Sequence, residues 1–213
     1  ISDAGTTDIT ATDITSINTT NTGTITVANA IDINGSGSQV KAAFDAIDTN
    51  TGNATANITG TDYTVAQLKA INNKTTGAIV LATSTSEALS GDATDLADAL
   101  AGTINYTGNV TVTDNAYTVA ELVAINAGTT GSITLNTANV ALSGTVANIK
   151  LAFAGTITTH TGTLEISDAG TTDITATHIT DINGTNTGAI TVTNAIDING
   201  SGSEVEAAFA AID

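Results

Sequence analysis

The stretch YTVAELVAINAGTTGSITL, residues 117–135, decides the fold. Thr118 and Glu121 have the spacing of a capping box, in which the threonine caps the first turn of a helix and the glutamate bonds back to the cap amide. Every third residue of the helix that follows is apolar, which predicts a narrow stripe on one helix face formed by Val119, Leu122 and Ile125. We expect residues 126–128, Asn-Ala-Gly, to end this helix in a left-handed conformation.

A corner and a short strand complete the unit. Thr130 and Gly131 form the corner, and residues 132–135 alternate polar and apolar side chains, which is typical of a half-buried strand. A helix with so few apolar residues, followed by so short a strand, cannot bury its apolar faces alone. We therefore expect copies of the unit to stack above and below it.

Copies of the unit run from one end of the chain to the other. Thr-Gly corners recur, and each is followed by a strand with apolar residues at the second and fourth places after the glycine. The corner glycines are Gly23, Gly52, Gly77, Gly108, Gly131, Gly162 and Gly188. The apolar pairs are Ile25/Val27, Ala54/Ala56, Ile79/Leu81, Val110/Val112, Ile133/Leu135, Leu164/Ile166 and Ile190/Val192. Long and short spacings between corners mostly alternate, so we interpret the repeat as two coils of about 55 residues together.

A longer period is superimposed on this one. Residues 1–48 and 166–213 are the same segment, displaced by 165 positions, with eight changes. The changed pairs are Asp13/His178, Ser16/Asp181, Thr19/Gly184, Thr24/Ala189, Ala28/Thr193, Gln39/Glu204, Lys41/Glu206 and Asp45/Ala210. We expect residues 1–213 to be a single repeat array, an excerpt of a longer tandem array with a period of 165 and sub-repeats of about 55 residues. The absence of methionine indicates that the chain is not an intact primary translation product.

The composition is acidic and free of cysteine. Asp and Glu number 21 against four lysines, there is no arginine, and the formal net charge is −17. This charge disfavours nucleic acid and anionic membrane surfaces as partners and favours cations, above all calcium. Without cysteine no disulfide can form, which does not exclude secretion. No apolar run approaches the roughly 18 residues of a spanning helix, so we expect no membrane insertion.

The fold class that these repeats predict is an α/β solenoid. Short parallel strands would stack in a ladder, with one short helix per coil and two alternating coil types. Regularly placed Ile, Val and Leu argue against disorder, the rival interpretation of so much Thr and Asn. Aromatic residues make up only 3% of the chain, which suits thin regular layers better than one globular core.

Both coil types resemble repeats of a known kind. Residues 117–135 and residues 141–166, ALSGTVANIKLAFAGTITTHTGTLEI, are similar to Thr/Ala/Gly-rich tandem repeats of very large secreted or cell-surface proteins of cyanobacteria and proteobacteria. In those proteins runs of TVxxLxxI…TTGxIT alternate with runs resembling SxTxANIxxxLxAL. The resemblance covers the whole chain and implies a secreted solenoid used in surface coats, adhesion or filaments. Such proteins often carry the calcium-binding nonapeptide GGxGxDxUx, which this chain lacks.

The most suggestive polar cluster is DINGSGS at residues 32–38, repeated at residues 197–203. Oxygen-bearing side chains at alternate positions, with a glycine at the sixth place, match the front of a calcium loop. The candidate calcium ligands are Asp32, Asn34 and Ser36 and their copies Asp197, Asn199 and Ser201. Ala43 and Ala208 stand where such a loop needs a bidentate glutamate.

The same cluster has a purely structural interpretation. It can be a strand-to-helix turn in which Ser38 and Ser203 cap the next helix, with Ser203 and Glu206 in the spacing of a capping box. Calcium bridges between neighbouring coils or chains are a further expectation for so acidic an array.

Threonine dominates the central position of the strands. These positions are Thr26, Thr55, Val80, Thr111, Thr134, Glu165 and Thr191. A flat column of threonines could bind ice or glycan, but Val80 and Glu165 interrupt it. Threonine is also a good polar strand former, which explains the column without any ligand.

No set of residues predicts catalysis. His178 replaces Asp13, His160 lies in a corner, and neither has a cysteine or a second histidine near it in sequence. Solenoid enzymes that cleave glycans use one special pair of carboxylates, whereas the acids here are distributed copy by copy. We therefore expect no enzymatic activity.

We expect a structural protein at the cell surface or outside the cell. Its coils would build a filament, a surface layer or an adhesin stalk, with other copies of itself as the main partner. The first alternative is a module that binds glycan or ice along a strand face. The second is a glycan-degrading enzyme on a solenoid scaffold.

Overall fold

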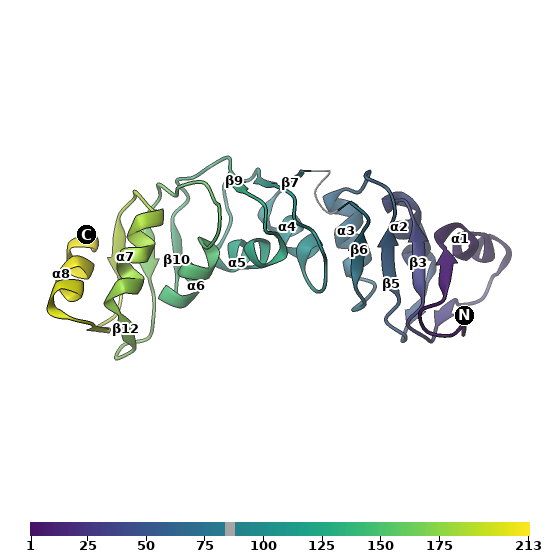
Figure 1. Ribbon diagram of the computed structural model, residues 1–213, viewed down its shortest axis with the longest axis horizontal. Coiled ribbons are helices and arrows are strands. Elements are labelled where there is room, and N and C mark those ends of the chain that lie inside the picture. Colours follow the sequence, from purple (N-terminus) through teal and green to yellow (C-terminus); the bar gives the residue numbers. More distant parts are fainter. Residues whose placement is uncertain (84–87) are drawn as a thin grey trace. The chain divides into compact units, whose positions relative to one another are not determined.

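The computed structural model describes residues 1–83 and 88–213, over which short helices alternate with short strands (Figure 1). The helices are α1 (Ala11–Thr20), α2 (Gly37–Ala46), α3 (Val65–Asn72), α4 (Ala93–Leu100), α5 (Val119–Gly128), α6 (Val146–Ala152), α7 (Ala176–Thr185) and α8 (Gly202–Ala211). The strands are β1 (Asp8–Thr10), β2 (Thr26–Val27), β3 (Asp32–Gly35), β4 (Thr49–Asn50), β5 (Thr55–Ile58), β6 (Ile79–Leu81), β7 (Leu89–Gly91), β8 (Val110–Val112), β9 (Ile133–Leu135), β10 (Leu142–Gly144), β11 (Leu164–Ile166), β12 (Asp173–Thr175), β13 (Ile190–Val192) and β14 (Asp197–Asn199).

The chain divides into two compact units. The first contains residues 1–91, 95–110 and 128–131. Its main sheet is parallel, in the order β1-β3-β5-β6, and sets Ile9, Ile33, Ala56 and Ile79 side by side. A second parallel pair, β2-β4, lies apart from it. Figure 1 shows β3, β5 and β6 next to one another, and α1, α2 and α3 pack in the same succession.

The second unit contains residues 92–94, 111–127 and 132–213. Its strands form a parallel sheet in the order β10-β11-β13 and a parallel pair β12-β14. Helix α7 packs against α6 on one side and α8 on the other. Both units therefore consist of short parallel strands with a short helix between successive strands of a sheet.

The predicted cap and stripe of α5 are confirmed. The Thr118 amide donates to Glu121 at 2.8 Å, the Glu121 amide donates to the threonine hydroxyl at 3.2 Å, and the stripe residues are buried. The predicted left-handed stop is wrong, because the helix continues to Gly128 and the left-handed glycines are Gly102 and Gly155. A Cβ on Gly128 would lie 2.5 Å from the Cβ of Leu100, so close packing explains this glycine.

The apolar pairs that follow the Thr-Gly corners form the core. All of these residues are buried except Val192, which is half-buried. A Cβ on Gly188 would lie 2.1 Å from the carbonyl oxygen of Gly162, and one on Gly131 would lie 2.2 Å from that of Gly108. These corners are glycine because the backbone of the preceding coil lies directly against them.

The corners do not, however, all open equivalent strands. Gly23 precedes β2, which pairs with β4, whereas Gly52 follows β4 and precedes β5, which pairs with β3. The connection from α1 to β2 is longer than that from α2 to β4, so the corner falls at a different place in successive coils. Several small sheets result, in place of the single ladder that corner spacing predicts.

The helices alternate between two types along the chain. In α1, α3, α5 and α7 an isoleucine-asparagine pair lies near the C-terminal end of the helix: Ile17-Asn18, Ile71-Asn72, Ile125-Asn126 and Ile182-Asn183. In α2, α4, α6 and α8 an alanine and a larger apolar residue take that place: Ala43-Phe44, Ala99-Leu100, Ala152-Phe153 and Ala208-Phe209. We call these first-type and second-type helices.

The two copies of the repeated segment adopt the same local structure. Helices α7 and α8 begin and end 165 residues after α1 and α2. The Asp48 carboxylate accepts a hydrogen bond from the Ile25 amide, and its copy Asp213 accepts one from Ile190. One cap differs, because Thr10 caps the Asp13 amide whereas Thr175 makes no cap bond where His178 has replaced that aspartate.

Candidate functional site

The six predicted calcium ligands lie at two strand-to-helix turns. Asp32 and Asn34 lie on β3 and their copies on β14, while Ser36 and Ser201 are the N-caps of α2 and α8. The predicted caps Ser38 and Ser203 are wrong. The glutamine or glutamate three residues after Ser36 and Ser201 completes the capping box there, because its side chain accepts a hydrogen bond from the cap amide.

The asparagines of these turns connect neighbouring strands. Asn34 Nδ2 donates to Asp8 Oδ1 at 3.0 Å, and Asn199 Nδ2 donates to Asp173 Oδ1 at 2.9 Å. Each amide therefore turns a donor, and not an oxygen ligand, toward the carboxylate of the preceding coil. Among the described residues no three of His, Asp and Glu gather in a group that could hold a metal ion. Calcium binding at these turns stays a prediction.

The capping box of the second turn also changes the pKa of one carboxylate. Hydrogen bonds from Ser201, first from its backbone amide and then from its side chain, lower the pKa of Glu204 below its usual value. The same position in the first copy is the neutral Gln39, whose side-chain oxygen accepts a hydrogen bond from the Ser36 amide and whose own amide donates to the Ser36 hydroxyl. The cap is therefore retained through a change of charge.

The predicted column of outward threonines is not continuous across the described sheets. Thr26 pairs in register with Thr49, and Thr55 pairs with Asp32. Val80 lies beside Asn57, and Glu165 lies between Ser143 and Thr191. Thr26 and Thr55 fall in different sheets, for the reason given above, whereas Thr111 of β8 and Thr134 of β9 lie on neighbouring strands of one sheet.

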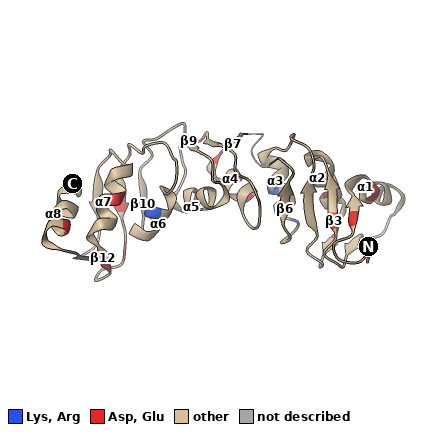
Figure 2. Ribbon diagram, viewed as in Figure 1, with Lys and Arg blue, Asp and Glu red and all other residues tan. Residues whose placement is uncertain are grey.

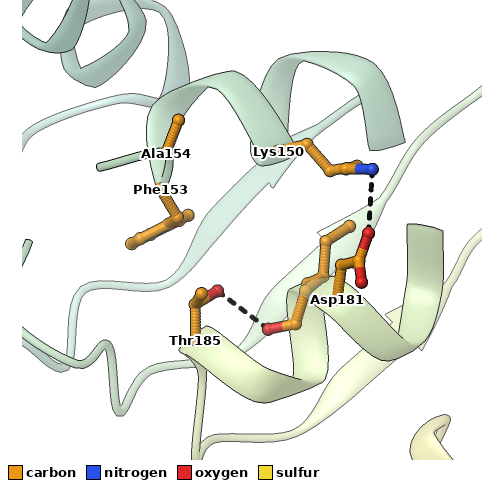
Figure 3. Close-up of a pocket in the computed structure, with 6 residues that line it drawn as sticks. Lys150, Phe153, Ala154, Asp181 and Thr185 are labelled. Atoms are coloured by element: carbon orange, nitrogen blue, oxygen red, sulfur yellow. Dashed lines mark hydrogen bonds and ion pairs between the residues drawn. The ribbon is translucent and has the colours of Figure 1, made fainter. Parts of the chain in front are cut away.

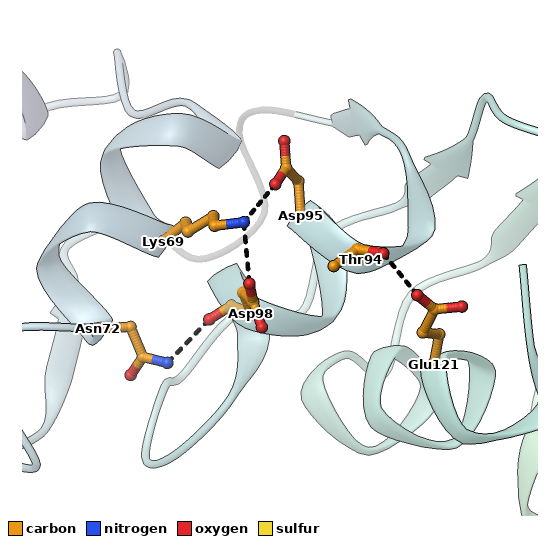
Figure 4. Close-up of polar contacts among 6 residues, drawn as sticks. All are labelled: Lys69, Asn72, Thr94, Asp95, Asp98 and Glu121. Carbon is orange, nitrogen blue, oxygen red and sulfur yellow. Dashed lines mark hydrogen bonds and ion pairs between the residues drawn. The ribbon is translucent and has the colours of Figure 1, made fainter.

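Polar contacts between successive helices are the most developed feature of the first unit. Figure 4 shows Lys69 of α3 between Asp95 and Asp98 of α4, with its Nζ 2.9 Å from Asp98 Oδ2. Hydrogen bonds to Asp95 and then Asp98 raise the pKa of this lysine above its usual range. Asn72 Nδ2 donates to the Asp98 carbonyl oxygen at 2.8 Å. A first-type helix is thus joined to the second-type helix that follows it by ion pairs and by a hydrogen bond to a backbone carbonyl oxygen.

The second unit uses the same kinds of contact. Asn126 Nδ2 donates to the Leu151 carbonyl oxygen at 3.0 Å, which repeats the contact of Asn72. Thr94 Oγ1 donates to Glu121 Oε1 at 2.6 Å (Figure 4). Lys150 of α6 lies 2.9 Å from Asp181 of α7, at the rim of a pocket of about 220 Å³ that Phe153 and Thr185 also line (Figure 3).

His160 has a role that the sequence does not reveal. The ring is fully buried, its Nδ1 lies 2.9 Å from Asn186 Oδ1, and its Nε2 lies 2.8 Å from the Val140 carbonyl oxygen. The Phe153 ring is tilted against it with 5.3 Å between centroids. Its partners belong to the preceding and following coils, so the histidine ties three segments together. Partners distant in sequence left no local motif by which to find it.

One pocket has two carboxylates and a histidine among the residues that line it. Asp168, Asp173 and His178 line a pocket of about 260 Å³ in the second unit. The Asp168 carboxylate is largely buried and accepts a hydrogen bond from the Val146 amide at 2.8 Å, so it serves the N-terminal end of α6. The other acidic residues of the described chain are scattered over helices, strands and loops (Figure 2).

The chain matches no protein-family model, no curated protein and no solved structure. Within the residues that the structure describes, none of the helices has the length and apolar character to span a membrane.

Proposed function

We propose that this chain is a structural repeat protein, an α/β solenoid with two alternating coil types. Its coils would stack and self-associate into an extracellular filament, surface layer or adhesin stalk. The resemblance of the coil sequences to repeats of large secreted proteins supports this proposal. The many described side-chain hydrogen bonds that join one coil to the next support it as well.

The observation that carries the proposal is the behaviour of the repeated segment. Residues 1–48 and 166–213 keep the same helices although eight positions differ. The apolar stripes are unchanged, and the changes fall on caps, on helix surfaces and on residues that flank β2 and β13. This is expected when the conserved requirement is stacking of coils and not a particular ligand geometry.

Electron microscopy of the negatively stained protein, with calcium and with a chelator, tests the proposal. We expect filaments or sheets that grow with protein concentration, and shorter assemblies after chelation if calcium bridges acidic coils. Single particles of one size under every condition would count against a structural role through self-association.

A second candidate function rests on the pocket lined by Asp168, Asp173 and His178. Paired carboxylates in a groove are the machinery of glycan cleavage. Release of reducing ends from a panel of polysaccharides, lost in an Asp173→Asn variant, would support this function. Equal hydrolysis by the protein and the variant would assign the activity to a contaminant.

A further inference from the structure

A polar pocket of about 200 Å³ lies in the first unit. Its wall is formed by the end of β4 and the turn that follows it, and by the end of α3 and the turn that follows that helix. The residues that line it are Asn50, Asn53, Asn72, Asn73, Lys74, Thr75 and Thr76. Every lining side chain carries an amide, a hydroxyl or an ammonium group. The lining therefore has no carboxylate, although the chain contains 21 acidic residues.

The three least exposed of these side chains hold the coils together. Asn50 Nδ2 donates to the Lys74 carbonyl oxygen at 3.2 Å, and Asn50 Oδ1 accepts a hydrogen bond from the Ala54 amide at 3.1 Å. Asn72 uses its Nδ2 in the contact with α4 described above. Thr75 is 7% exposed, and its hydroxyl donates to the Ala54 carbonyl oxygen at 2.6 Å. These contacts fix the shape of the pocket.

The other four lining side chains are exposed, and the fold does not use them. Within the described part of the chain, the side chains of Asn53, Asn73, Lys74 and Thr76 have no hydrogen-bond or ion-pair partner. The other three lysines of the chain each pair with one or two aspartates. The pocket thus presents one unpaired positive charge together with two amides and a hydroxyl that are free to bind a ligand.

The equivalent turn of another coil shows that the fold does not need these free groups. Thr129 corresponds to Thr75, because each lies two residues before a corner glycine. Both hydroxyls donate to a carbonyl oxygen of the preceding coil and accept a hydrogen bond from the amide of the corner glycine. Residues 73–74 are Asn-Lys, whereas residues 127–128 in the other turn are Ala-Gly. The amide and the charge are therefore additions to a turn that forms without them.

We propose that this pocket binds a sugar that carries one carboxylate, as a hexuronic acid does. Amide groups both donate and accept hydrogen bonds, so they match the hydroxyls of a sugar ring. The Lys74 ammonium supplies one positive charge, which balances one carboxylate. The net charge of −17 disfavours ligands with several negative charges. Drug-sized molecules occupy about 300–1,000 Å³, so a pocket of about 200 Å³ suits a single sugar ring.

This site does not depend on the proposed self-association, and either can fail without the other. A structural array that also bound such sugars would attach to glycans through a defined pocket, and not through the threonines of its strands. The pocket lies in one place in the array, because residues 127–128 lack the amide and the charge.

The test is saturation-transfer difference NMR of the 213-residue chain with galacturonate, galactose and acetate. This method observes the ligand, so it works on single chains and on assemblies alike. Galacturonate should bind with a Kd in the millimolar range, and galactose more weakly because it lacks the carboxylate. Acetate, which lacks the sugar ring, should give no measurable binding.

Two variants and a matched control locate the site. Lys74→Gln should weaken galacturonate binding about two- to fivefold, the scale of an exposed ion pair, and galactose binding by much less. Asn73→Ala should weaken the binding of both sugars. Lys41→Gln removes the same charge from a lysine of α2 that pairs with Asp45, and should bind galacturonate like the wild type. Circular dichroism of each variant checks that the fold is kept.

Four results would overturn the proposal. No binding of galacturonate well above the millimolar range would remove the site. Equal weakening in Lys41→Gln and Lys74→Gln would show an effect of net charge alone. Acetate that binds as well as galacturonate would reduce the pocket to an anion contact of one lysine. Loss of self-association in Lys74→Gln, with galacturonate binding unchanged, would assign this lysine to a contact between copies of the chain.

Discussion

Truncation of one phenylalanine in each copy of the repeated segment measures how much a covering coil contributes to the free energy of unfolding. Phe44 is fully buried, and Phe44→Ala should cost about 3–5 kcal/mol in free energy of unfolding. Phe209 is 62% exposed and retains little more than a third of that burial, so Phe209→Ala should cost only about 1–2 kcal/mol. Both substitutions remove the same atoms from nearly the same helix sequence.

The assay is urea unfolding followed by circular dichroism, at a concentration low enough to keep the chain monomeric. Repeat arrays need not unfold in a single step, so amide exchange in α2 and α8 should accompany the unfolding curves. We expect Phe44→Ala to accelerate exchange in α2 far more than Phe209→Ala does in α8. Equal decreases in the free energy of unfolding for the two variants would refute the reasoning, because the decrease would then not depend on how deeply the phenylalanine is buried.

Three further predictions concern packing, pH and calcium. Gly188→Ala should lower stability by about 1–3 kcal/mol because the new Cβ would meet backbone of the preceding coil. Gly23→Ala should be neutral in thermal unfolding, because its Cβ would make only an ordinary contact, at 3.5 Å, with the Asn21 side chain. Burial, and then the charge of a nearby aspartate, raises the pKa of Tyr117 to about 12. The folded state therefore holds this proton when the unfolded state has lost it. Stability should fall between about pH 10 and pH 12, and less steeply in Tyr117→Phe. Calcium should raise the melting temperature, and the double variant Asp32→Asn, Asp197→Asn should lose that increase; an unchanged increase would place calcium elsewhere.

Much of the local structure could be predicted from the sequence because its causes are local. The capping box at Thr118 and the buried stripe of α5 depend only on residues within one helix. The burial of the apolar pairs after each corner follows from strand periodicity. These features need no knowledge of neighbouring coils.

The predictions were wrong where the local conformation or the strand pairing depends on a segment from another coil. Gly128 suggested a left-handed helix stop, but it is the last residue of α5 and is glycine because the Leu100 side chain packs directly against it. The corners at Gly23 and Gly52 look alike in sequence, yet connections of different length put their strands in different sheets. His160 has no local motif because its partners, Val140 and Asn186, lie far from it along the chain.

Hydrogen–deuterium exchange of the two copies, at low and at high protein concentration, tests the central claim most directly. At low concentration the amides of residues 190–213 should exchange faster than the equivalent amides of residues 25–48, because only the latter are covered by a following coil. At high concentration exchange should slow wherever copies of the chain contact one another. Equal exchange of the two segments at low concentration, or exchange that is independent of concentration along the whole chain, would contradict the account.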